Sequence, residues 1–96
     1  MRSLYLVSYD VCHPKRLRRV YVQMCGFGEW VQYSVFLCRL NRIEKIRLLD
    51  QIGRLIKHDE DRVMIVDLGP AEGRGADCVE FLGQKMEFPG DGPIVL

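Results

Sequence analysis

One stretch near the N-terminus, residues 3–10 (SLYLVSYD), constrains the fold more than any other. It is rich in residues that favour β-strands, and its odd and even positions both carry apolar side chains. A strand that is apolar on both faces is normally central in a sheet and covered on both sides. We therefore predict a central strand at 3–10, which leaves the sheet at a carboxylate, Asp10.

Two later segments carry the apolar periodicity of amphipathic helices. Residues 14–25 begin at a proline, which suits the first turn of a helix, and then place an apolar residue at every third or fourth position. Residues 42–57 follow an Asn41-x-x-Glu44 capping box. Their predicted buried stripe consists of Ile43, Ile46, Leu49, Ile52 and Ile56.

Aromatic and β-branched residues indicate further strands at 29–31, 34–40 and 62–68, with a tight connection at 32–33. The order strand, helix, strand, strand, helix, strand is that of the α+β ferredoxin-like fold, a four-stranded antiparallel sheet with both helices on one face. A weaker alternation predicts a short fifth strand at 78–83. Because a chain of 96 residues buries a limited core and one sheet face needs cover, we expect a homodimer.

The C-terminal end of the chain is unusual in composition. We expect residues 1–83 to form one ferredoxin-like domain and residues 84–96 to form a tail. A free tail is normally polar, but this one ends on three apolar residues, Ile94, Val95 and Leu96. The tail is therefore expected to dock on the partner protomer, as a strand added to a sheet edge would.

Charge is unevenly distributed along the chain. Residues 1–58 carry a net charge of +7 and residues 59–96 carry −6, which together give +1. A basic body can bind a polyanion such as nucleic acid, and an acidic C-terminal third also permits head-to-tail pairing of two copies.

The cysteine spacing and the hydropathy limit where in the cell the protein could reside. Four widely spaced cysteines without a Cys-x-x-Cys pair favour reduced thiols over disulfides or structural zinc. No stretch approaches the roughly 18 apolar residues of a membrane helix, and the N-terminus lacks the pattern of a signal peptide. We expect a cytoplasmic protein that does not enter a membrane.

Asp10 is followed closely by a run of cations that includes Arg16, Arg18 and Arg19. A rigid carboxylate beside cations is a common construction for a metal or phosphate site, and Mg²⁺ prefers oxygen ligands. Only one such carboxylate is present, so a metal site would need Asp10 from each of two protomers. Otherwise Asp10 is a turn residue and the arginines are a solvated helix face.

Two other chemistries are open. Cys12 and His13 suggest a thiol nucleophile, although neighbouring residues rarely converge on one point and nothing in the sequence activates the thiol. Trp30, Tyr33 and Phe36 could stack on nucleic-acid bases, although aromatic strand residues are more commonly part of a core or a dimer interface.

The first strand and a later segment, taken together, resemble the CRISPR-associated protein 2 family. The matching residues are Leu-Tyr-Leu-Val-Ser-Tyr-Asp at 4–10, Lys15-Arg16-x-Arg18-Arg19-Val20, and Gly-Glu-x-Val-Gln-Tyr-Ser-Val-Phe at 28–36. The resemblance implies a ferredoxin-like homodimer with Mg²⁺-dependent endonuclease activity on RNA or double-stranded DNA. It also implies a scaffold role in spacer acquisition, in which the dimer bridges the CRISPR integrase (CRISPR-associated protein 1) and holds new DNA.

Residue by residue, the resemblance implies that Asp10 is the catalytic residue and the metal ligand, one from each protomer. Phosphates would be held by Arg16, Arg18 and Arg19, and the site would be supported by Tyr9, Ser34 and Phe36. The chain departs from the family at Trp30, where arginine is common, and at Leu37, where an acid is common. These departures affect hydrolysis more than DNA binding, so a non-catalytic DNA-binding scaffold is the alternative. A small-molecule regulator is the third class, but the sequence carries no ligand motif for it.

Overall fold

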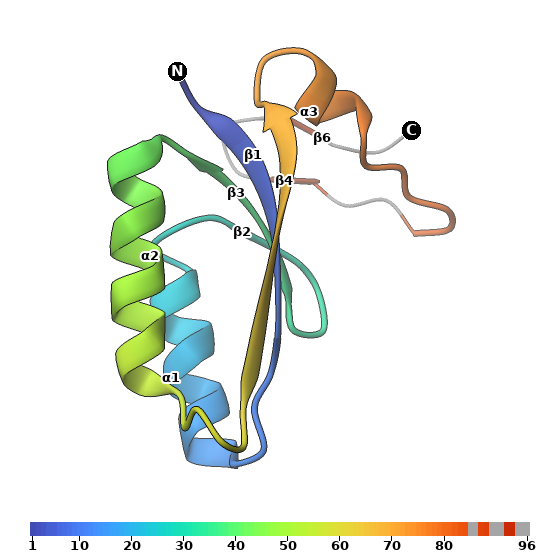
Figure 1. Cartoon of the computed structure of the whole chain (residues 1–96). Helices are drawn as coiled ribbons and strands as arrows, with labels where there is room; N and C mark the ends of the chain where they lie inside the picture. The colour runs from blue at the N-terminus through green and yellow to red at the C-terminus, as the bar shows by residue number, and fades with distance from the viewer. Residues whose placement is uncertain (85–86, 89–91, 94–96) are drawn as a thin grey trace.

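The computed structural model describes residues 1–84, 87–88 and 92–93 (Figure 1). Four antiparallel strands form one sheet in the order β2-β3-β1-β4, and two helices cover one of its faces. The strands are β1 (Ser3–Asp10), β2 (Glu29–Gln32), β3 (Val35–Leu40) and β4 (Arg62–Pro70), and the helices are α1 (Pro14–Met24) and α2 (Arg42–Leu55). This arrangement confirms the predicted ferredoxin-like fold.

Strand β1 lies between β3 and β4, as its two apolar faces predict. Its odd-numbered side chains face the helices and belong to the main core, where Val7 is fully buried. Its even-numbered side chains point to the opposite face, where Leu4 joins a smaller apolar cluster. That cluster also contains Val31, Leu37 and Ala71, with Val79 and Phe81 packed against it.

The core contains one thiol. Cys38 of β3 is fully buried, and burial raises the pKa of this thiol to about 12, with the Glu29 carboxylate adding to the rise. The other cysteines, Cys12, Cys25 and Cys78, are exposed, and all four are free. The absence of disulfides agrees with the interpretation of the cysteine spacing.

Helix α2 presents a different face to the sheet from the one predicted. Leu48 and Ile52 are buried, whereas Ile43, Ile46 and Leu49 are 61%, 57% and 49% exposed. The helix carries a second apolar row, Leu48, Ile52, Leu55 and Ile56, and it is this row that meets the core. The Asn41–Glu44 capping box closes the start of the helix, and Lys45 lies over the Tyr5 ring at 5.1 Å. The predicted stripe was therefore wrong for the first half of the helix.

The connection between β2 and β3 lies one residue later than predicted. Strand β2 continues to Gln32, and the turn consists of Tyr33 and Ser34. Tyr33 has φ 42°, in the left-handed region that favours glycine. Since neither turn residue is glycine or proline, the sequence carries no strong signal for a turn here.

The chain after β4 also differs from the prediction. Residues 74–77 form a short helix, α3 (Arg74–Asp77), and the fifth strand predicted at 78–83 is absent. Val79 and Phe81 pack on the smaller cluster while Leu82 is fully exposed, so this segment covers the sheet face with side chains instead of pairing with it.

Two short strands near the C-terminus, β5 (Glu87–Phe88) and β6 (Gly92–Pro93), pair with each other. Ile94, Val95 and Leu96 lie outside the described residues, so the boundary at 83/84 and the docking of the tail stay predictions. Within the described part of the chain, no helix is long and apolar enough to cross a membrane.

Candidate nucleic-acid and metal site

Four segments meet at one end of the sheet. They are the C-terminal end of β1, the start of α1, the β2–β3 turn and the start of β4 (Figure 1). Asp10 is exposed there and pairs in register with Arg62 of β4. Since side chains alternate along a strand, Asp10 lies on the sheet face opposite the helices. Its carboxylate is therefore accessible on a rigid part of the backbone.

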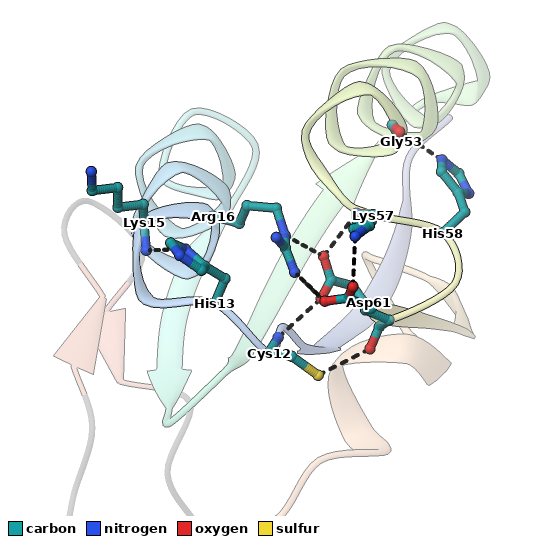
Figure 2. A network of polar contacts seen from close by, with 9 residues as sticks. Cys12, His13, Lys15, Arg16, Gly53, Lys57, His58 and Asp61 are labelled. Atoms are coloured by element: carbon teal, nitrogen blue, oxygen red, sulfur yellow. Dashed lines mark hydrogen bonds and ion pairs between the residues drawn. The ribbon is translucent and has the colours of Figure 1, made fainter.

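Arg16 holds a buried carboxylate close to Asp10. Figure 2 shows the Arg16 side chain directed at Asp61, whose side chain has no exposed surface. The Arg16 Nε and Nη2 atoms donate to the two carboxylate oxygens of Asp61 at 2.8 and 3.1 Å, and Nη2 also donates to Glu60 at 3.3 Å. This bidentate pair fixes the start of α1 against the α2–β4 turn.

Asp61 also binds the backbone of two other segments. Its oxygens accept hydrogen bonds from the N–H groups of Cys12 at 2.9 Å and Lys57 at 2.8 Å. The hydrogen bonds from Arg16 are the largest cause that holds the pKa of Asp61 well below its usual range, and these N–H groups add to it, against the effect of burial.

The Asp61 network bears directly on the geometry at Asp10. Cys12 is two residues after Asp10, and Asp61 precedes Arg62, the register partner of Asp10 in the sheet. The network therefore ties the backbone just after Asp10 to the backbone just before its sheet partner, Arg62. Sequence reasoning missed Asp61, because in a run of three acids, Asp59 to Asp61, nothing indicates which carboxylate is buried.

Arg18 and Arg19 lie differently from Arg16. Both are exposed, and together with Lys15 they line a shallow pocket of about 410 Å³ on α1. Among the described residues, neither arginine is paired with a carboxylate. Phosphate contact by Arg16, Arg18 and Arg19 stays a prediction.

The supporting residues named from the sequence lie together. Tyr9 is nearly buried, and its ring stacks on that of Phe36 at 6.2 Å between centroids. Phe36 is fully buried in the main core, and its role in supporting the site stays a prediction. The Tyr9 N–H donates to the Ser34 carbonyl at 3.0 Å, which ties the end of β1 to the β2–β3 turn. Burial raises the pKa of the Tyr9 hydroxyl to about 12.

The thiol-nucleophile interpretation finds no support in the geometry. The Cys12 thiol donates to the Glu60 carbonyl oxygen at 3.0 Å. The His13 ring instead caps α1, where Nδ1 accepts from the Lys15 N–H at 3.2 Å (Figure 2). Each side chain thus has its own structural partner, and the two are not hydrogen-bonded to each other.

The donor set fits Mg²⁺ only in part. Within the described residues, no group of three His, Cys, Asp or Glu side chains could hold a metal ion. One protomer offers the Asp10 carboxylate, and Mg²⁺ is commonly held by one or two carboxylates together with substrate phosphates and water. The chemistry of Asp10 suits the ion, and the remaining ligands would come from the partner protomer, solvent and substrate.

The two departures from the family pattern have structural roles. Leu37 is buried in the smaller apolar cluster. Trp30 is half exposed, and its Nε1 donates to the Tyr33 carbonyl oxygen at 2.7 Å. Trp30 therefore fixes the β2–β3 turn.

Comparison with known proteins identifies the family. The family model for CRISPR associated protein Cas2 matches residues 1–73. The chain belongs to the Cas2 family. The match spans the whole four-stranded sheet and both long helices, so it confirms the resemblance found in the sequence. The family takes its description from CRISPR systems, and curated relatives of this chain are named CRISPR-associated endoribonucleases.

Individual Cas2 proteins show how close the similarity is. A CRISPR-associated endoribonuclease Cas2 from Geobacter sulfurreducens is 51% identical over 72 residues, which cover 75% of this chain and 76% of that protein. A second, from Rhodospirillum rubrum, is 45% identical over 83 residues, 86% of this chain and 80% of that protein. The crystal structure of Streptococcus pyogenes Cas2 matches with a TM-score of 0.73 at 32% identity, covering 83% of this chain and 99% of that one.

Proposed function

We propose that this Cas2 family member is a metal-dependent endonuclease of CRISPR adaptation that hydrolyses phosphodiester bonds in RNA or double-stranded DNA. The observation that supports it best is the exposed Asp10 carboxylate at the end of the central strand, with its backbone fixed by the Asp61 network. The names of the Geobacter sulfurreducens and Rhodospirillum rubrum relatives, both called endoribonucleases, support the reaction class.

Asp10 from each of two protomers is the proposed ligand set for Mg²⁺. When bound, the ion would polarise a phosphate and lower the pKa of a bound water. The Arg18 and Arg19 guanidinium groups would neutralise neighbouring phosphates. In this scheme Arg16 positions the start of α1 through Asp61, and Tyr9, Ser34 and Phe36 hold the end of β1 and the adjoining turn.

The homodimer that this scheme needs is proposed to form through the sheet face opposite the helices. Met64 and Val66 of β4 are 53% and 38% exposed, and register places them on the same face as Asp10. Burial of these apolar side chains would favour association. A dimer through this face would also bring the two Asp10 residues towards a common axis.

The second candidate is a DNA-binding scaffold without nuclease activity. It is favoured by the buried Leu37, which stands where an acid is common in the family. In this scheme the dimer holds duplex DNA through Arg18 and Arg19 and bridges the CRISPR integrase, CRISPR-associated protein 1, in the cytoplasm. Binding would weaken steeply with salt and depend little on sequence.

The deciding experiment compares wild type with Asp10→Asn in cleavage of labelled RNA and duplex DNA, with Mg²⁺ or EDTA. We expect cleavage by wild type to require Mg²⁺. Asp10→Asn should lower the cleavage rate by at least about 100-fold, because mutating even a residue that hydrogen-bonds to a metal ligand typically costs 10- to 100-fold in metal affinity or activity. Asp59→Asn is the matched control, because Asp59 is exposed in the nearby α2–β4 turn.

The two candidates predict different results. Full activity of a folded Asp10→Asn variant would exclude the metal-ligand role. No cleavage by a wild-type dimer that still binds duplex DNA in a salt-dependent way would support the scaffold.

A further inference from the structure

A groove of about 460 Å³ lies between α1 and the β2–β3 turn, at the same end of the sheet as Asp10. Tyrosines from three different elements line it: Tyr9 of β1, Tyr21 of α1 and Tyr33 of the turn. Arg18 lines this groove and also the neighbouring basic pocket. Aromatic rings beside a cation form a surface suited to a flat, negatively charged ligand.

Tyr33 is not explained by folding alone. Its side chain is 90% exposed, and its backbone has φ 42°, a conformation that suits glycine or asparagine better. The hydrogen bond of 2.7 Å from Trp30 Nε1 to its carbonyl oxygen helps to hold this turn. A large ring kept in solvent on a strained backbone neither adds to the core nor eases the turn.

The other side of the groove is rigid. The Tyr21 ring is 40% exposed and meets the buried Phe36 edge-on, with 5.7 Å between ring centroids. Tyr9 stacks on the same phenylalanine. Because these rings are already packed, binding of a ligand to the groove would cost little side-chain entropy.

We propose that this tyrosine groove binds one unpaired nucleotide, with its base stacked on Tyr33 and its phosphate on Arg18. This inference rests on the proposed function, since the nucleotide belongs to the nucleic acid that the protein binds. Stacking tolerates any sequence because every base has a π face. Within a duplex those faces are already stacked on their neighbours, so the groove favours single-stranded segments over blunt duplex.

The test measures fluorescence anisotropy of labelled single-stranded RNA, single-stranded DNA and blunt duplex, each about 12 nucleotides long. EDTA is present so that no strand is cut. Tyr33→Ala removes the ring and Tyr33→Phe keeps it, and both retain a Cβ, so the strain at φ 42° is unchanged. Arg18→Ala removes the proposed phosphate contact and should weaken single-strand binding more than Arg42→Ala does, where Arg42→Ala is the charge-matched control because Arg42 is an exposed cation at the start of α2.

We expect Tyr33→Ala to weaken binding of the single strands by about 10-fold, as the loss of one stacked base does, and duplex binding by less than about 2-fold. Tyr33→Phe should bind like wild type. Nucleotide binding in the groove would be excluded by equal losses on single strands and duplex, by no loss at all, or by a change of oligomeric state in light scattering. The last result would place Tyr33 in a protomer interface.

The experiments distinguish failure of the proposed nucleotide binding from failure of the proposed nuclease activity. Wild type that cleaves through Asp10 while Tyr33→Ala binds normally overturns the groove alone. Tyr33-dependent binding of single strands without any cleavage supports the groove and overturns the nuclease. Wild type that binds no nucleic acid overturns both.

Discussion

At the scale of single residues, the end of β1 depends on Asp61. A carboxylate without exposed side-chain surface is costly unless its oxygens are satisfied, and here they accept from the Arg16 guanidinium and two backbone N–H groups. Removing the negative charge would leave Arg16 with the more exposed Glu60, at 3.3 Å, as its acidic partner among the described residues. Asp61 therefore connects folding stability to the placement of Asp10.

This dependence predicts the behaviour of the protein in acid. The pKa of Asp61 is lowered by folding, so its contribution to stability is complete above the unfolded value of about 3.9 and is lost as the pH falls toward the folded value. We expect wild-type Tm to fall below about pH 4. Asp61→Asn should lower Tm near neutral pH by about 5–10 °C and show a shallower acid decline.

Thermal melts from acid to neutral pH would measure this effect, with Asp59→Asn as the matched exposed control. Parallel pH profiles of wild type and Asp61→Asn would show that Asp61 is not the group concerned.

The arginines show what sequence can and cannot reveal at this scale. Arg16, Arg18 and Arg19 look alike as a basic run, but one is held on a buried acid and two are exposed. The difference comes from the distant α2–β4 turn, about which local sequence carries no information. Asp10, in contrast, was placed correctly at a strand end because strand periodicity is local.

At the scale of elements, α2 shows a helix whose existence was predictable but whose rotation was not. Its sequence holds two apolar rows, and only packing against the sheet decides between them. Leu48 and Leu49 are neighbours in the chain, yet one is 1% and the other 49% exposed. This adjacency offers a direct test of the rotation.

We expect Leu48→Ala to lower the free energy of unfolding by about 2–4 kcal/mol, because it leaves a cavity in the main core. The same change at Leu49 should stay within about 0.5 kcal/mol. Urea unfolding of both variants would measure the difference. Equal losses, or a larger loss at Leu49, would mean that α2 presents the originally predicted stripe to the core.

At the scale of the whole molecule, the order of the strands leaves one sheet face with exposed apolar groups. The segment after β4 covers part of this face through Val79 and Phe81, but Met64 and Val66 remain accessible on it. The ferredoxin-like order was predictable because each element is periodic. The path after Pro70 was not, since its residues pack through scattered side chains without a repeating pattern.

The proposed dimer gives a matched pair of charge insertions. Met64 on the sheet face and Ile46 on the outer face of α2 are similarly exposed, at 53% and 57%. Met64→Lys should shift the protein from dimer to monomer and abolish any cleavage that needs two Asp10 residues, because a buried unpaired charge is costly. Ile46→Lys should leave both unchanged. Light scattering at micromolar concentration would check this, and a persistent Met64→Lys dimer would exclude this face as the interface.

The position of Cys38 gives the molecule a built-in reporter of core opening. Its thiol is enclosed between the sheet and the helices and has a pKa of about 12, so at neutral pH it is neither accessible nor ionised. Cys12, Cys25 and Cys78 are open to solvent. An alkylating reagent would modify those three thiols rapidly. It would reach Cys38 only when β3 separates from the helices that cover it. The rate of that last modification records how often the core opens, without any added label.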